Sequence, residues 1–96
     1  MAVAVVMDFK GGTLEQYDEV IGKMGLVPEG SGPPGALFHW VTLTPTGLEV
    51  TDVWESRQQF DDFARDQIGP FTAEVGIPGP PEMTFHEVHN YFTSGD

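Results

Sequence analysis

The segment VTDVWES, Val50 to Ser56, has the residue types of a β-strand that leads into a helix. Its β-branched residues and its indole favour a strand, and Ser56 is a common residue type at the N-cap of a helix. Side chains alternate between the two faces of a strand, so Asp52 and Trp54 point to the same face. The segment therefore predicts a strand that ends at a helix and carries a carboxylate and an indole on one face.

The rest of the chain supplies elements that complete a small fold around this strand. The pattern predicts a strand over residues 2–9, a helix from Thr13 to Gly25, a hairpin of ALFHWVTL and LEVTDVWE around residues 44–47, a helix after Ser56 that Gly69-Pro70 breaks or kinks, and a last strand in EMTFHEVHNYF. The order is βαββαβ in a single domain, residues 1–96. Two helices that cover one face of a four-stranded antiparallel sheet give a ferredoxin-like arrangement, which is an α+β fold.

The composition of the chain restricts its partners and its compartment. Its 96 residues include 15 acidic and 4 basic side chains, which give a net charge of -11. Phosphate backbones and anionic lipids are bound through Lys and Arg, so neither nucleic acid nor a membrane is an expected partner. The chain has no cysteine, and its apolar first nine residues lack the cationic start of a signal peptide. The cytoplasm is the expected compartment.

Both faces of the predicted sheet are apolar, although two helices can cover only one of them. In the first strand, Val5 and Met7 lie on one face, and Ala4 and Val6 lie on the other. An apolar sheet face that no helix covers needs another partner, and a second copy of the chain supplies one. The expected assembly is a homodimer that packs sheet against sheet, a dimeric α/β-barrel with a cavity inside or between the sheets.

The order of the elements and the segment TDVWESRQQFDDF, residues 51–63, resemble the dimeric α/β-barrel superfamily, in particular its antibiotic-biosynthesis-monooxygenase-like proteins. The shared local pattern is an apolar strand that ends in Trp54-Glu55-Ser56, followed by a helix with Phe60 on its inner face. The resemblance implies that Trp54 faces a cavity. It also implies a small aromatic or polyketide-like ligand, which some members oxygenate without a cofactor. Folds of this kind host several activities, so the chemistry stays open.

Haem-degrading members of the same superfamily carry two residues that this sequence lacks. The resemblance puts their haem-ligating histidine at or near Ala73 and their first-strand asparagine at Val5. No histidine lies between Trp54 and His86, so haem degradation is disfavoured. No cofactor is expected.

The predicted hairpin brings a histidine beside Asp52. With a two- or four-residue loop, His39 faces Asp52 and Leu37 faces Trp54 across the two strands. A carboxylate fixes the tautomer of a neighbouring histidine and raises its basicity, which positions a general base. We therefore predict His39 as a catalytic base and Asp52 as the residue that orients it. An odd loop would pair Trp40 with Asp52 instead, and a His–Asp pair can also serve only to satisfy hydrogen bonds in a half-buried sheet.

Further residues are predicted to line the cavity and to contact its ligand. The indole of Trp54 supplies a flat wall, and packing at a dimer interface is its alternative role. The first two strands add apolar side chains, and one face of the last strand adds polar ones, although the pattern does not say which face that is. The predicted ligand-binding residues are Trp54, Val5, Met7, Leu37, His89 and Tyr91.

Two functions of different kinds remain open at this point. The first is an enzyme, a cofactor-independent monooxygenase or cyclase that acts on an aromatic or polyketide-like substrate. The second is a noncatalytic module of the same fold that binds a ligand or dimerises. A set of His39, Asp52 and either His86 or His89 has the residue types that hold non-haem iron, but the spacing is not diagnostic, so we predict no metal.

Overall fold

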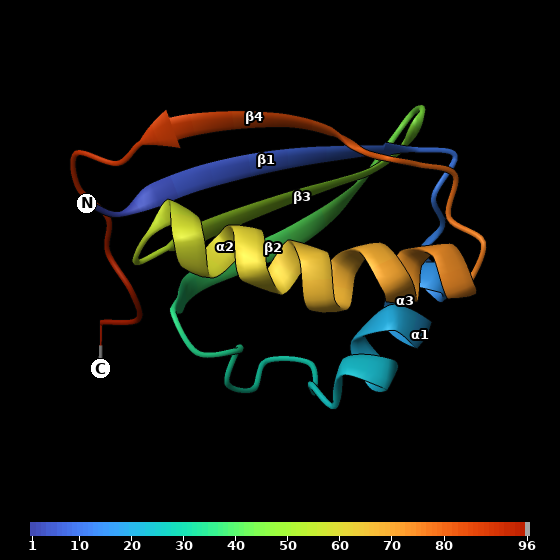
Figure 1. The fold of residues 1–96 in the computed structure, drawn as a ribbon, viewed down its shortest axis with the longest axis horizontal. Helices are drawn as coiled ribbons and strands as arrows, with labels where there is room; N and C mark the ends of the chain where they lie inside the picture. Colours follow the sequence, from blue (N-terminus) through green and yellow to red (C-terminus); the bar gives the residue numbers. More distant parts are fainter. Residues whose placement is uncertain (96) are drawn as a thin grey trace.

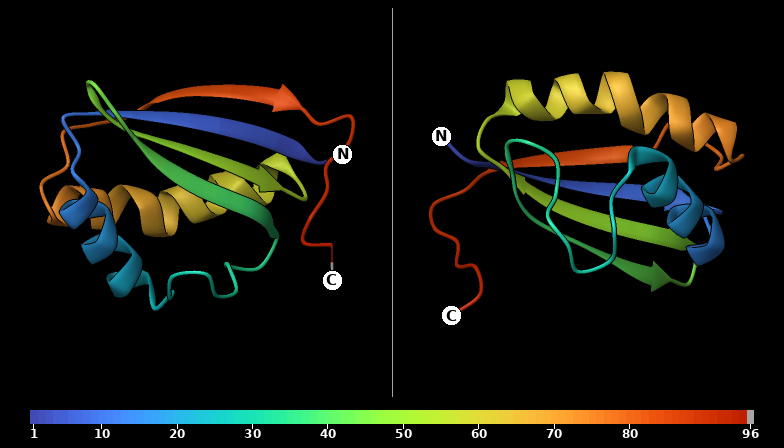
Figure 2. Two further views of the ribbon diagram at one scale, coloured as in Figure 1. Left: turned by 180° about the vertical axis from the view of Figure 1, so that it is seen from behind. Right: turned by 90° about the horizontal axis from the view of Figure 1, so that it is seen from below.

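The computed structural model describes residues 1–95 as a four-stranded antiparallel sheet with its helices on one face (Figures 1 and 2). In chain order the elements are β1 (Val3–Lys10), α1 (Leu14–Met24), β2 (Ala36–Thr44), β3 (Gly47–Trp54), α2 (Arg57–Phe63), the π-helical segment η1 (Ala64–Ile68), α3 (Gly69–Glu74) and β4 (Glu82–Glu87). The strand order β2-β3-β1-β4 confirms the predicted ferredoxin-like α+β fold. Within these residues, none of the helices combines the length and the apolar character that crossing a membrane requires.

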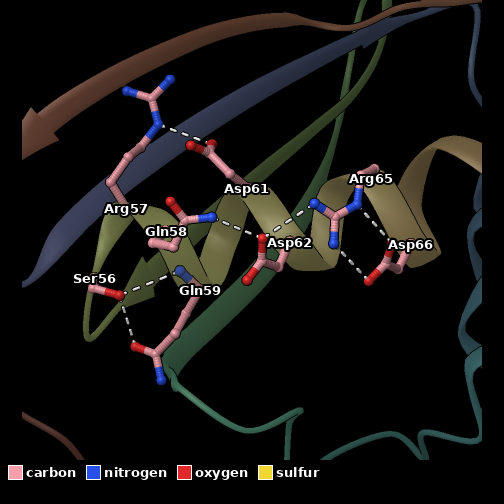
Figure 3. A network of polar contacts seen from close by, with 8 residues as sticks. All are labelled: Ser56, Arg57, Gln58, Gln59, Asp61, Asp62, Arg65 and Asp66. Carbon is pink, nitrogen blue, oxygen red and sulfur yellow. Dashed lines mark hydrogen bonds and ion pairs between the residues drawn. The ribbon is translucent and has the colours of Figure 1, made fainter.

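Both predicted helix starts are capped by the side chains that the sequence indicates. The Thr13 hydroxyl accepts a hydrogen bond from the Gln16 backbone N–H at 3.1 Å, and the Gln16 side chain accepts one from the Thr13 N–H at 3.0 Å. α1 ends at Gly25, whose left-handed conformation (φ 78°) suits glycine. Ser56 caps α2 by accepting from the Gln59 backbone N–H at 3.2 Å (Figure 3). These caps satisfy free backbone N–H groups and fix where each helix begins.

The sequence predicted that Gly69-Pro70 breaks or kinks the helix that begins at Arg57; the helix continues past this pair, so a break is wrong, and its regular α-helical turn is interrupted just before the pair. α2, η1 and α3 follow one another as one helical rod beside the sheet (Figure 1). Pro70 has no backbone N–H, and its ring crowds the carbonyl group one turn earlier in a regular helix. The wider π-helical turn of η1 comes just before it, and there the Gly69 N–H donates to the Ala64 carbonyl. The rod therefore accommodates the proline by widening instead of ending.

The hairpin between β2 and β3 turns through two residues, 45–46. This even length gives the register that pairs His39 with Asp52, which confirms the predicted pairing. Gly47 begins β3 with a φ of 153°, and a Cβ at this position would lie 2.2 Å from the Phe9 carbonyl oxygen. The turn can therefore close against the end of β1 only with glycine at this position.

The start of β2 contains a bulge that the sequence did not reveal. The register shifts between Ala36 and Phe38, so that Ala36 lies opposite Trp54. The predicted pairing of Leu37 with Trp54 is therefore wrong. Leu37 is the extra residue of the irregular stretch, and such an insertion leaves one residue unpaired and bends the strand.

β4 is shorter than predicted, because β1 has no further residues to pair with it. The pattern extended the strand to residue 92, but β4 ends at Glu87, opposite Val3 at the start of β1. The Val88 N–H still donates to the Ala2 carbonyl at 3.0 Å. Residues 89–95 then leave the sheet as irregular chain.

The densest part of the core lies between β1, β3, β4 and the start of the rod. The ring of Phe60 on α2 packs edge-on against Trp54 and Phe85, with ring centroids 5.9 and 5.6 Å apart. The largest fully buried side chains are Trp54, Phe60, Met7, Leu48 and Val5.

Candidate functional site

A cavity of about 890 Å³ lies between the helices and the β2–β3 side of the sheet. Its walls come from β1, β2 and β3, from α1 and the rod, from the loop over residues 26–33 and from residues 93–94. Most of the lining side chains are apolar, for example Met7, Ile21, Val41, Val50 and Phe63. Pockets of this size and character hold small organic ligands.

The predicted base and its orienting carboxylate lie together in the wall of this cavity. His39 Nδ1 is 2.5 Å from Asp52 Oδ1. A carboxylate only accepts hydrogen bonds, so Nδ1 carries a proton, and in the neutral imidazole Nε2 then holds the lone pair. The side chain of Asp52 is 6% exposed and that of His39 is 38% exposed. The carboxylate is therefore shielded from water, whereas the imidazole stays accessible.

Tyr17 extends this pair to a chain of three side chains, and the sequence analysis did not single it out. Its hydroxyl lies 2.5 Å from His39 Nε2, and the two rings stack with centroids 5.9 Å apart. Since Nε2 holds the lone pair, the Tyr17 hydroxyl is the donor. Burial, and then the negative charges of Asp52 and Asp18, raise the pKa of Tyr17 to about 12. The hydroxyl therefore keeps its proton at neutral pH.

Trp54 fixes Asp52 from the other side. Its indole N–H donates to Asp52 Oδ2 at 3.1 Å, and its ring packs against Phe60 and Phe63 with centroids 5.9 and 5.2 Å apart. Trp54 belongs to the cavity wall, but only 1% of its surface is exposed. The indole thus acts mainly on the carboxylate, which in turn orients His39.

The apolar residues predicted for the wall divide between the cavity and the core. Met7 on β1 and Leu37 in the bulge of β2 line the cavity. Val5 is 0% exposed and pairs with Asp52 on one side and with Phe85 on the other. It is not among the lining residues, because the dense core under α2 covers this part of the sheet.

The histidines near the C-terminus lie away from His39 and Asp52. His89 and Tyr91 follow the end of β4 and are not among the residues that line the cavity, because the strand expected to direct them has already ended. His86 pairs with Ala4, so it lies on the sheet face opposite the helices. Among residues 1–95, no three potential metal ligands lie close enough together to hold an ion. The candidate iron ligands His39, Asp52 and either His86 or His89 are therefore not brought together as one set.

Comparisons with known proteins place this arrangement in a recognisable fold. No protein-family model and no curated protein matches the sequence. A provisionally assigned antibiotic biosynthesis monooxygenase from Chloroflexus aurantiacus matches in structure, with a TM-score of 0.66, 17% identity and coverage of 99% of this chain and 100% of that chain. A monooxygenase of Streptomyces coelicolor in complex with the ligand nanaomycin D matches with a TM-score of 0.59, 24% identity and coverage of 98% and 92%. The chain has an antibiotic-biosynthesis-monooxygenase-like fold.

A conserved protein from Methanosarcina mazei also matches in structure, with a TM-score of 0.60, 17% identity and coverage of 90% of this chain and 91% of that chain. At these identities the similarity concerns the fold alone. Because one fold can host several activities, the function of this chain depends on its own side chains.

In this antibiotic-biosynthesis-monooxygenase-like fold, the polar chain at the cavity can take up one proton. Trp54 and His39 both donate to Asp52, and Tyr17 donates to His39, so each donor has an acceptor. The Tyr17 oxygen keeps lone pairs that can accept a hydrogen bond from a ligand hydroxyl. Passage of the Tyr17 proton to Nε2 would leave an imidazolium beside a carboxylate, which stabilises it.

Proposed function

We propose that the protein binds a small aromatic or polyketide-like molecule in the cavity and removes a proton from one of its hydroxyl groups without a cofactor. The observation that carries the proposal is the Tyr17–His39–Asp52 chain at the wall of an apolar cavity. Deprotonation makes an aromatic ring rich enough in electrons to react with dioxygen or to close a new ring. The Streptomyces coelicolor monooxygenase with bound nanaomycin D supports this class of ligand through its shared fold.

The proton transfer takes place over two hydrogen bonds. The ligand hydroxyl donates to the Tyr17 oxygen, and its O–H bond breaks as the Tyr17 proton moves to His39 Nε2. Tyr17 ends with the proton of the ligand and His39 with the proton of Tyr17, so no tyrosinate accumulates. This agrees with the raised pKa of Tyr17. Asp52 holds the imidazole in the tautomer that can accept, and its charge stabilises the imidazolium.

The test compares two histidines on the two faces of the sheet. His39→Ala should lose the enzyme-dependent oxygen uptake with a dihydroxynaphthalene, down to the spontaneous rate, which corresponds to a loss of roughly 100-fold or more. His39 lies on the edge strand β2 and is half exposed, so the variant should keep its fold by circular dichroism. His86→Ala on the other face is the matched control and should keep full activity. Equal activity of all three proteins would remove His39 from the reaction.

A noncatalytic ligand-binding module is the second candidate function. It is favoured by the fact that every donor in the polar chain already has an acceptor within the protein. This function predicts saturable binding of naphthols by isothermal titration calorimetry, with no product in mass spectrometry and only the spontaneous rate of oxygen uptake for both the unaltered protein and His39→Ala.

We also propose that the protein is a homodimer whose two sheets pack face to face. The proposal is supported by Phe38 and Trp40, which lie in contact on the helix-free face and are 47% and 45% exposed. Val6 lies on the same face and is only partly buried, so it extends this apolar area, which favours burial against a second copy. A Trp40→Glu variant should sediment as a monomer at concentrations where the unaltered protein sediments as a dimer. The cytoplasm stays the proposed compartment.

A further inference from the structure

The walls of the cavity carry carboxylates and no cationic side chain. Among the described residues that line it, the Asp, Glu, Lys and Arg side chains are Asp18 on α1, Glu29 in the loop and Asp52 on β3. Glu29 has a φ of 61°, an unfavourable conformation for residues other than glycine. Asp18 and Glu29 are exposed at the rim of the cavity, whereas Asp52 is buried.

The cationic side chains of the chain lie elsewhere. Figure 3 shows the two arginines on the rod, each beside an aspartate of the same helix. Arg57 also lies over the ring of Phe85, 3.4 Å from its centroid, on the β4 side of the molecule. The four cations form ion pairs as follows: Lys10 with Glu82 at 3.3 Å, Lys23 with Glu74 at 2.9 Å, Arg57 with Asp61 at 3.0 Å, and Arg65 with Asp66 at 2.8 Å.

The strongest hydrogen-bond donors at the centre of the site are also occupied. The Trp54 N–H donates to Asp52, and the Tyr17 hydroxyl donates to His39. A negatively charged ligand would therefore give up its hydration and meet a buried carboxylate, with no lysine or arginine in the wall to compensate. Taking an unpaired charge into such a site is strongly unfavourable.

We infer that the cavity selects uncharged ligands and excludes anions, so that the substrate enters with its hydroxyl group un-ionised. The inference rests on the proposed function for the identity of the site. The internal proton transfer is compatible with this selection, because the proton stays on His39 and the net charge of the occupied cavity does not change. An anion from solution, in contrast, adds one negative charge to those of Asp18, Glu29 and Asp52.

The test uses two ligands of equal shape that differ in charge, 2-naphthamide and 2-naphthoate, with isothermal titration calorimetry at pH 7. The amide is expected to bind at least about tenfold more tightly than the carboxylate, as repulsion over several ångströms at an intermediate dielectric implies. Binding of 2-naphthoate as tight as that of the amide would overturn the inference and leave the proposed function standing. If neither compound nor 2-naphthol binds, the cavity is not an aromatic site, and both proposals fail.

Two double variants separate the charge of the cavity from the net charge of the protein. Asp18→Asn with Glu29→Gln removes two carboxylates from the wall and should tighten binding of 2-naphthoate severalfold, with the amide unchanged. Asp8→Asn with Glu49→Gln removes two carboxylates that pair on the opposite sheet face and should change neither affinity. An equal gain in both double variants would show that net charge sets the preference, which overturns the assignment to the cavity. An unchanged ratio in the first variant overturns the role of Asp18 and Glu29.

Discussion

The two faces of the sheet use the same strands for different purposes. Asp52 and Thr51 are neighbours on β3, and both are buried, with 4% and 8% exposure. Asp52 lies under the helices in a network of aromatic and polar side chains, whereas Thr51 lies on the open face opposite the exposed Trp40. The comparison teaches that the alternation of side chains along a strand is enough to put the proposed catalytic residues on one face and the proposed dimer surface on the other. One residue of shift in register would exchange the two faces.

The largest expected effect compares the two tryptophans, one on each face. Trp54→Ala should reduce the free energy of unfolding by about 3–5 kcal/mol, because it empties a fully buried site between Phe60 and Phe63. Trp40→Ala should cost the monomer no more than about 1 kcal/mol, since its side chain is largely exposed. Urea denaturation measures both. Equal losses would contradict the difference between the faces.

The next effect concerns the turn that sets the register of both faces. Gly47→Ala should cost about 3 kcal/mol or more, because the added Cβ would overlap the Phe9 carbonyl and the Gly11 N–H, which are backbone atoms that cannot move aside. Gly22→Ala is the matched control. A Cβ at Gly22 on α1 meets nothing within 4 Å, so this variant should gain about 0.5–1 kcal/mol from its higher helix propensity. A loss of stability in both would refute the steric explanation.

A smaller loss of stability is expected when Asp52, which accepts from both Trp54 and His39 on the helix-covered face of the sheet, is replaced. Asp52→Ala leaves the Trp54 N–H and His39 Nδ1 without their acceptor and should cost about 2 kcal/mol. Thr51→Ala, one residue away on the open face, should cost no more than about 1 kcal/mol. Thermal unfolding of the pair gives the difference. A larger loss for Thr51→Ala would reverse the ranking of the two faces.

The smallest expected effect is a pH dependence of the stability that comes from Tyr17, whose hydroxyl bonds to His39 on the helix-covered face of the sheet. The pKa of Tyr17 rises from 10.0 to about 12 on folding, so the folded protein holds this proton more tightly than the unfolded chain. The resulting contribution to stability is complete below pH 10 and is lost as the pH rises toward 12. Tyr17→Phe should show a shallower loss over this range, because its other titrating groups are the same. Parallel curves for the two proteins would argue against a buried, hydrogen-bonded Tyr17.

The parts of the fold that the sequence predicted depend on residues close together in the chain. The caps at Thr13 and Ser56, the stop at Gly25 and the turn residues 44–47 are local signals. They left the length of the hairpin loop open, and the two-residue turn in the structure is one of the lengths that pair His39 with Asp52. Their catalytic role stays a prediction.

The features that the sequence did not predict depend on distant partners. Tyr17 on α1 meets His39, 22 positions later, only because the helix packs over β2, and nothing in the helical stripe distinguishes this contact from ordinary packing. The length of β4 depends on where β1 begins, so a strand pattern that ran on to Phe92 overestimated it. The residue types before Phe38 likewise do not indicate the bulge in β2.

The opposite environments of the two indoles also give the protein two built-in optical probes. Trp54 is enclosed and hydrogen-bonded to Asp52, so its emission should lie toward the blue, whereas Trp40 is exposed in the single chain and should emit toward the red until a second copy covers it. Quenching by an added collisional agent should act on Trp40 of the unpaired chain and spare Trp54. Single-tryptophan versions of the chain can therefore report separately on filling of the cavity and on pairing of the sheets, without any attached dye.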